Sequence, residues 1–172
     1  MRIAYADPPY PGCSHLYAGH PDYAGEVDHE ALASRLSTEY DGFILHTSST
    51  ALRDVLPLFD SSVRLMAWVK PFAAFKRNVS VAYAWEPVLV KACRKPVVTK
   101  RIVMRDWISE PITMQRGLAG AKPAAVCYWA FEMVGALPTD TLDDLFPGTG
   151  AVKRAWESWA YDIHRAGFLA SL

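Results

Sequence analysis

The sequence lacks an excess of charge of either sign, because 18 Lys and Arg residues balance 18 Asp and Glu residues over 172 positions. A neutral chain has no overall field that would attract a polyanion, so any contact with nucleic acid must come from a local patch. Long apolar runs are lacking too: no stretch reaches the roughly 18 residues of a membrane-spanning helix, and no charged-then-apolar leader opens the chain. We therefore expect neither membrane insertion nor secretion.

Cysteine is scarce, and the three cysteines are Cys13, Cys93 and Cys127. Their odd number, their wide spacing and the lack of any C-x-x-C pair argue against a disulfide framework and against a zinc site. The five histidines follow no metal-ligand spacing either. We expect a protein without metal in a reducing cytoplasm.

At 172 residues and 51% hydrophobic composition, the chain can bury a core of its own as one domain. Apolar segments of strand length alternate with segments of helical length, a pattern typical of an α/β protein with an open, mostly parallel sheet and helices on both faces. No internal repeat interrupts this alternation. We expect strands at 2–6, 42–47, 64–69, 83–90 and from 141, and helices from 28, from 48 to 56, from 122 to 134 and from 151 to 166.

The short apolar run Ile3-Ala4-Tyr5 is followed almost at once by Asp7-Pro8-Pro9-Tyr10. Two prolines fix φ near about −65° and remove two backbone donors, so a strand must end here in a rigid loop. The Asp7 carboxylate and the Pro8 carbonyl can accept hydrogen bonds from a planar exocyclic amine, and Tyr10 offers a ring on which a base can stack. The alternative is a proline-rich turn that merely ends a strand.

A second motif runs from Thr141 to Gly150 with the sequence Thr-Leu-Asp-Asp-Leu-Phe-Pro-Gly-Thr-Gly. It predicts a short strand, an acid and a glycine turn that opens a helix near Ala151. Glycines let the backbone approach a ligand above the carboxyl end of a strand, and the amides of the helix N-terminus then face that ligand. Many strand–helix units carry such a turn, so this motif alone is weak evidence for a ligand site. It becomes strong evidence together with Asp-Pro-Pro-Tyr.

With both motifs, the chain resembles the S-adenosylmethionine-dependent DNA methyltransferases that methylate amino groups. In that family Asp-Pro-Pro-Tyr is the catalytic loop and Asp-x-Phe-x-Gly-x-Gly is the cofactor loop. The catalytic motif comes first here, as in the circularly permuted β-type, an order shared by the Asp-Pro-Pro-Trp adenosine methyltransferases. The chain is most similar to small phage-type adenine-N6 enzymes, which implies a Rossmann-like methyltransferase fold with an antiparallel edge.

The resemblance implies roles for individual residues. Its catalytic positions are Asp7, Pro8, Pro9 and Tyr10, and its cofactor positions are Asp144, Phe146, Pro147, Gly148, Thr149, Gly150 and Lys122. The implied reaction passes a methyl group directly from the sulfonium of S-adenosylmethionine to adenine N6, while Asp7 and the Pro8 carbonyl draw the amine toward tetrahedral geometry. Because a duplex hides that amine, the nucleotide must be flipped out of the DNA.

Residues 91–105 hold six cations and no acid, which makes this the only sustained one-signed segment. The family places its target-recognition element in this part of the chain. We therefore expect residues of about 91–120 to form a minimal DNA-recognition insertion within a single domain spanning 1–172, with a steep salt dependence of DNA binding. The alternative is a solvated charged loop. The predicted DNA contacts are Lys91, Arg94, Lys95, Lys100, Arg101 and Arg105.

Glu86-Pro87 interrupts an otherwise apolar strand, where a proline suits a bulge or a sheet edge. Two interpretations remain open for the neighbouring pair. Trp85 can be a core residue beside a solvated Glu86, or both side chains can lie near the flipped base.

The chain departs from the family after the last predicted helix, which Gly167 should stop. A complete methyltransferase continues into strands that hold the cofactor ribose and adenine, so the resemblance implies a fold truncated on the cofactor side. The strand at 141–144 should then be an exposed sheet edge, and such an edge favours a homodimer.

Three alternatives to a DNA adenine methyltransferase remain. The enzyme can act on cytosine N4, although the family members that do so more often have serine in place of Asp7. It can act on adenosine in RNA. The chain can also be a catalytically silent partner subunit that binds nucleic acid, although an intact Asp7 and an intact Gly148-Thr149-Gly150 argue against that.

Overall fold

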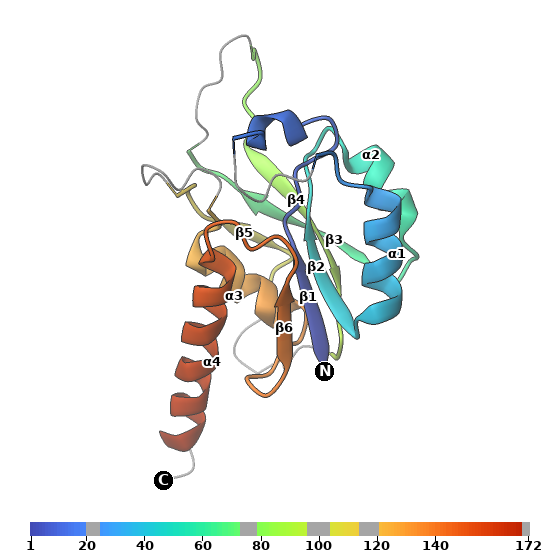
Figure 1. Ribbon diagram of the computed structural model, residues 1–172. Coiled ribbons are helices and arrows are strands. Elements are labelled where there is room, and N and C mark those ends of the chain that lie inside the picture. Colours follow the sequence, from blue (N-terminus) through green and yellow to red (C-terminus); the bar gives the residue numbers. More distant parts are fainter. Residues whose placement is uncertain (20–24, 73–78, 96–103, 114–120, 170–172) are drawn as a thin grey trace.

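The computed structural model describes residues 1–19, 25–72, 79–95, 104–113 and 121–169, of which 16, 17 and 164–169 are described by their backbone only. Within these residues six strands form one sheet in the order β5-β3-β4-β2-β1-β6 (Figure 1). The strands are β1 (Arg2–Ala6), β2 (Gly42–His46), β3 (Arg64–Val69), β4 (Trp85–Lys91), β5 (Trp107–Ser109) and β6 (Thr141–Asp144).

One strand of this sheet runs against the others. β1 is parallel to β2 and β6, and β5 is parallel to β3, whereas β4 is antiparallel to both of its neighbours, β2 and β3. The predicted α/β class and the predicted antiparallel pair at 64–69 and 83–90 are confirmed. The carboxyl ends of β1, β2, β3, β5 and β6 consequently share one end of the sheet.

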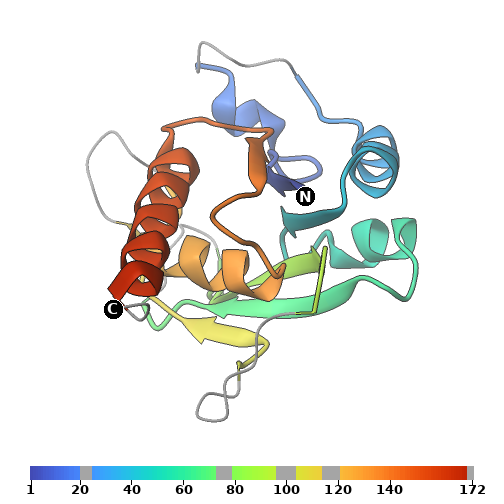
Figure 2. The same ribbon diagram turned by 90° about the horizontal axis from the view of Figure 1, so that it is seen from below.

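Helices cover both faces of the sheet (Figure 2). α1 (His29–Glu39) and α2 (Leu52–Val55) lie on one side, and α3 (Ala124–Met133) and α4 (Ala151–Leu169) lie on the other. Two short 3₁₀ helices, η1 (Ser14–Tyr17) and η2 (Leu56–Leu58), complete the described elements.

Strand alternation divides the core into two clusters. Ile3, Tyr5 and Ile44 face α3 and α4, where they pack with Phe131 and Trp159. Ala4, Phe43, Leu45 and Leu89 face the other way and pack with Leu36 of α1 and Val55 of α2. Both faces of β1 and β2 are buried, which is the arrangement expected of central parallel strands.

Side-chain oxygens cap the starts of two helices. Asp28 precedes α1, and its carboxylate accepts a hydrogen bond from Ala31 N–H at 2.9 Å. Ser48 Oγ accepts from Ala51 N–H at 3.1 Å just before α2. One predicted end was wrong, because α4 runs through Gly167 to Leu169. A single helical glycine costs only about 1 kcal/mol and does not have to end a helix.

Pro87 lies in an interior strand rather than at a sheet edge. Its register partner on β3 is Ala67, whose N–H donates away from β4, to Asp106 O. The missing Pro87 donor therefore faces the end of β2, where Thr47 N–H still donates to Pro87 O at 3.2 Å. The proline removes at most one ladder bond, at the point where β2 stops.

β5 and β6 form the two edges of the sheet. β5 was not predicted, and it places Trp107–Ser109, part of the expected recognition segment, in the sheet beside β3. At the other edge β6 pairs with β1 alone among the described strands, so the predicted exposed edge is confirmed, while the homodimer stays a prediction. No helix in the described residues is long and apolar enough to cross a membrane.

Candidate active site

The Asp7-Pro8-Pro9-Tyr10 loop leaves the carboxyl end of β1 directly after the buried residue Ala6. Its outgoing end is fixed by a turn in which Cys13 N–H donates to Tyr10 O at 2.8 Å. Gly12 N–H then donates to Glu26 Oε1, also at 2.8 Å. The Asp7 side chain remains 22% exposed, so this carboxylate is anchored at the surface of the sheet end rather than buried within it.

The second motif leaves the neighbouring strand at the same end of the sheet. Tyr5 of β1 is the register partner of Asp144, the last residue of β6, and Leu145 N–H donates to Tyr5 O at 2.9 Å. The loop turns through Gly148 and Gly150, whose φ values of 44° and 71° favour glycine. α4 begins at the next residue. The two motifs that are far apart in the sequence therefore lie side by side (Figure 1).

Lys122 joins the first motif to the middle of the sheet. Its ammonium lies 2.8 Å from Asp7 Oδ2 and 3.1 Å from Glu86 Oε1, and the residue is only 9% exposed. Burial alone would lower the pKa of this lysine, but the charges of Asp7 and Glu86 outweigh burial and raise it. Lys122 is therefore a permanent cation, held two residues before α3 by two carboxylates.

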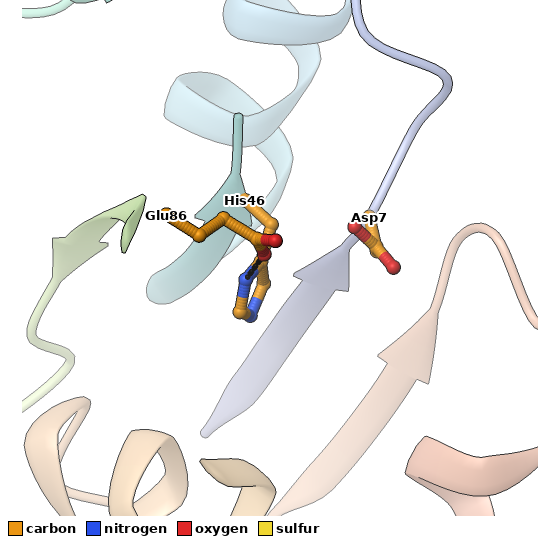
Figure 3. Close-up of side chains that lie close together, drawn as sticks. All are labelled: Asp7, His46 and Glu86. Atoms are coloured by element: carbon orange, nitrogen blue, oxygen red, sulfur yellow. Dashed lines mark hydrogen bonds and ion pairs between the residues drawn. The ribbon is translucent and has the colours of Figure 1, made fainter. Parts of the chain in front are cut away.

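Glu86 and His46 form a buried pair that the sequence did not predict as functional (Figure 3). His46 Nδ1 lies 2.7 Å from Glu86 Oε1, and His46 Nε2 lies 2.7 Å from the Tyr5 hydroxyl. Glu86 is 4% exposed whereas Trp85 is 39% exposed, so the interpretation with a core tryptophan and a solvated glutamate is wrong. The strand alternation points Glu86 to the same face as Val88 and Val90.

The cations around Glu86 control its ionisation. Burial alone would raise the pKa of Glu86, but Lys122, the hydrogen bond from His46 and Lys70 hold it well below its usual range. Lys70 follows β3, and its Nζ lies 2.7 Å from Glu86 Oε2. The sequence offered one signal for this pair: Glu86 and His46 are polar residues within apolar strands. Each lies at the end of its strand that is nearest Asp7.

A metal ion fits this cluster poorly. Asp7, His46 and Glu86 each offer a ligand atom within 4.8 Å of the others, and they are the one such group in the described part of the chain. The Lys122 ammonium already contacts two of these three ligands. A divalent ion would have to share that space with a buried cation.

The second motif fits an added ligand better. Asp144 Oδ1 accepts from Phe146 N–H at 3.3 Å, but Asp144 Oδ2 is buried and has no hydrogen-bond partner among the described residues. Burial raises the pKa of Asp144, and the charge of Asp7 adds to that increase. A Cβ added at Gly148 would meet nothing closer than Phe146 O at 3.9 Å. An acceptor without a donor and open space over a glycine are what a bound cofactor would require.

A cavity of about 280 Å³ lies between the first turns of α3 and α4. Lys122, Pro123 and Ala124 line one side, and Ala151 and Arg154 line the other. Arg154 also donates to Thr149 O at 2.9 Å, which ties the glycine loop to α4. The predicted cofactor residues Lys122 and Thr149 thus lie at or beside one cavity, next to two helix N-termini.

No family model matches the sequence, and no curated protein matches it. Solved structures do match. The crystal structure of M1.HpyAVI in complex with SAM aligns with a TM-score of 0.58 and 17% identity, over 92% of this chain and 78% of that chain. A second crystal structure of M1.HpyAVI aligns with a TM-score of 0.54 and 16% identity, over 92% of this chain and 76% of that chain. At such low identity the likeness establishes the fold alone, and it confirms the fold class that the sequence predicted.

Two of the predicted DNA contacts, Lys91 and Arg94, lie away from the Asp7 loop. Lys91 ends β4 opposite Phe43, at the end of the sheet remote from Asp7. Arg94 is also remote, because its guanidinium binds Asp140 and the Gly135 carbonyl. Lys95 and Arg105 are exposed, and Arg105 lies over the ring of Trp107 at 5.3 Å. Lys100 and Arg101 lie outside the described residues.

Proposed function

We propose that this protein is a methyltransferase that transfers the methyl group of S-adenosylmethionine to N6 of adenine in DNA. The observation that carries the proposal is the adjacency of two carboxylates at the ends of neighbouring parallel strands, Asp7 after β1 and Asp144 at the end of β6. The first is the acceptor for the amine. The second, with its orphaned oxygen, belongs to the cofactor loop.

Asp7 orients and polarises the amine. Lys122 occupies Asp7 Oδ2, whereas Oδ1 makes no hydrogen bond within the described part of the chain and is free to accept one N–H. The Pro8 carbonyl accepts the other, because prolines at positions 8 and 9 remove the nearest competing donors. Two acceptors localise the nitrogen lone pair and stabilise the positive charge that develops on nitrogen during transfer.

Asp144, Gly148, Thr149, Gly150 and Lys122 would hold S-adenosylmethionine, with Phe146 and Pro147 completing the loop. The cofactor supplies a methyl group made electrophilic by its sulfonium. Asp144 presents its unpaired oxygen, and the glycines keep the loop backbone open to close approach. With the cofactor bound, the amine nitrogen would take the methyl carbon and the electron pair of the broken bond would stay with sulfur. The partly exposed Asp7 would then pass the surplus proton of the nitrogen to solvent.

DNA contact rests on the cations of the 91–105 segment and on Tyr10. Lys95 and Arg105 are the best candidates in the described part of the segment, because both are exposed and Arg105 lies over an aromatic ring, as in nucleic-acid interfaces. Replacing either by Ala should reduce the magnitude of the log–log salt slope of DNA affinity by about 0.9 for each phosphate that the variant no longer binds. If the salt dependence of DNA affinity is unchanged in both variants, the segment is a solvated surface that does not contact DNA.

The direct test is incubation with labelled S-adenosylmethionine and unmodified duplex DNA, followed by nucleoside analysis. We expect label in N6-methyladenine, and Asp7→Ala should reduce incorporation by about 10²- to 10³-fold while DNA binding persists. Glu39→Gln is a matched control, because it removes an exposed acid that pairs with Arg35 at the end of α1, outside both motifs and outside the basic segment.

The other outcomes of this experiment separate the alternatives. Label in N4-methylcytosine, or in RNA but not in DNA, would change the substrate and keep the mechanism. Binding of nucleic acid without any transfer would contradict the enzyme and favour a silent partner subunit.

A further inference from the structure

Glu86 contacts three polar side chains that come from three other segments of the chain. Its Oε1 lies 2.7 Å from His46 Nδ1 and 3.1 Å from Lys122 Nζ, and its Oε2 lies 2.7 Å from Lys70 Nζ. We infer that Glu86 is a positioning residue that holds Lys122 on one oxygen of Asp7 and so keeps the other oxygen free for the acceptor amine. This role deepens the proposed function and rests on it.

The occupancy of its two oxygens excludes Glu86 as a direct acceptor for the substrate. Three donors already use them, and the residue is 4% exposed. Asp7 has one oxygen bound by Lys122 and a side chain that reaches the surface. Glu86 can therefore act on the reaction only through the side chains that it holds.

Lys122 shows what that action is. An ammonium has three donors, and beside a single carboxylate it can contact both oxygens. Glu86 Oε1 shares this ammonium at 3.1 Å, while Asp7 Oδ2 lies 2.8 Å from it. Without Glu86, Lys122 is free to cover both oxygens of Asp7 and to compete with the amine.

A closed ring of contacts fixes Glu86 in turn. His46 Nδ1 lies 2.7 Å from Glu86 Oε1, and His46 Nε2 lies 2.7 Å from the Tyr5 hydroxyl, so the imidazole bridges Glu86 and Tyr5. Tyr5 lies on β1, two residues before Asp7. The ring thus runs from β1 through His46 and Glu86 to Lys122 and back to β1.

Stability alone gives a weak reason for this arrangement. Lys70 and Lys122 balance Glu86 and Asp7, so the cluster is neutral, yet taking these charges out of water costs about as much as their attraction returns. Apolar residues of similar size would serve a core equally well. A ring of ion pairs does what apolar packing cannot, because it sets the direction from which a cation approaches Asp7.

The test compares Glu86→Gln with Asp140→Asn, which removes a buried acid at the remote end of the sheet. Glu86→Gln should lower kcat by about 10- to 100-fold, as small misplacements of reacting groups do, with the cofactor KM and the DNA Kd within about twofold of the parent. Asp140→Asn should keep the kcat of the parent. Equal kcat in Glu86→Gln and the parent would overturn the inference.

Variants of His46 and the pH dependence of kcat provide two further tests. His46→Asn keeps a donor at the position of Nδ1 and should retain most of the activity, whereas His46→Leu should resemble Glu86→Gln. Without the Glu86 carboxylate, the raised pKa of Lys122 should fall, and the kcat of Glu86→Gln should decline at a lower alkaline pH than that of the parent. A fall in kcat with an unchanged profile would indicate a merely structural role.

Failure of the proposed function is separable from failure of this inference. If the parent transfers no methyl group to any nucleic acid, the proposed function fails. Crystal structures then decide the inference: Glu86→Gln should show Lys122 Nζ within hydrogen-bond distance of both oxygens of Asp7. A lysine that keeps its position on Oδ2 alone would overturn it.

Discussion

Asp140 and Asp144 lie at opposite ends of β6. Both oxygens of Asp140 accept hydrogen bonds, whereas within the described residues only one oxygen of Asp144 does. Asp140 accepts from the Met1 ammonium at 2.9 Å, from Leu137 N–H at 2.7 Å and from both terminal nitrogens of Arg94. Asp144 accepts from Phe146 N–H at 3.3 Å, and in the part of the chain that the structure describes its Oδ2 has no hydrogen-bond partner. The carboxylate at one end of the strand thus has hydrogen-bond partners for both oxygens, and the carboxylate at the other end has a partner for one.

The ionisation of the two acids follows from this difference. Hydrogen bonds from Arg94 hold the pKa of Asp140 far below its usual range, whereas burial raises the pKa of Asp144. The remote end of the sheet therefore gains stability from its acid. At the end of the sheet beside Asp7, the buried Asp144 lowers the stability of the fold but keeps a hydrogen-bond acceptor available, which is typical of a binding site.

The largest expected effect of this contrast is on folding. Asp140→Asn should lower the free energy of unfolding by about 2 to 3 kcal/mol, because it leaves Arg94 and the N-terminus without their carboxylate, and Arg94 is partly exposed. Urea unfolding measures this change. Methyl transfer per folded molecule should stay at the parent level, and a matching loss of transfer would break the contrast between the two ends.

Asp144→Asn should act in the opposite direction. Removing a half-buried charge without a full set of donors should stabilise the free protein by about 1 kcal/mol, since Asn can still accept from Phe146 N–H. The affinity for S-adenosylmethionine, measured by calorimetry, should fall by at least about tenfold. A variant that is destabilised and binds the cofactor normally would show that Asp144 is structural.

The pH dependence of stability sharpens the contrast further. The lowered pKa of Asp140 gives stability that is present above the unfolded value of about 4 and is lost as the pH falls through the folded pKa. The raised pKa of Asp144 means that the folded state binds the proton more tightly, so stability is greatest below about pH 4 and declines as the pH rises through the folded pKa. The two Asn variants should therefore differ from the parent with opposite signs at pH 7. Both differences should shrink in acid, which unfolding curves at pH 3 and pH 7 would measure.

Sequence patterns were sufficient where local chemistry decides the structure. Alternation and prolines located β1, the Asp28 carboxylate marked α1, and the acid–glycine turn marked the end of β6. Each of these signals lies within a few residues of the feature that it predicts. The adjacency of the two motifs then followed from parallel strands sharing one end of a sheet.

Long-range contacts decided the rest. The ring of Tyr5, His46, Glu86 and Lys122 comes from four separate segments. A polar residue within an apolar strand can be seen in the sequence, but the partner that it contacts cannot. Arg94 was predicted to bind DNA from its place in a basic segment, but the structure pairs it with Asp140, which lies 46 positions away. A charge run reports composition, whereas the partner of each charge is set by topology.

The smallest expected effect on stability is at Gly148, in the loop that follows Asp144. Alanine there should cost about 1 kcal/mol of strain at a φ of 44°, of which roughly half is offset because alanine restricts the unfolded chain. Gly25→Ala is the matched control, since its φ is 87° and an added Cβ meets nothing within 4 Å. Both variants should unfold at similar urea concentrations. Only Gly148→Ala should raise the cofactor KM, because its methyl group enters the open space over the loop that is proposed to hold the cofactor. Equal KM values in both variants would remove this loop from the binding site.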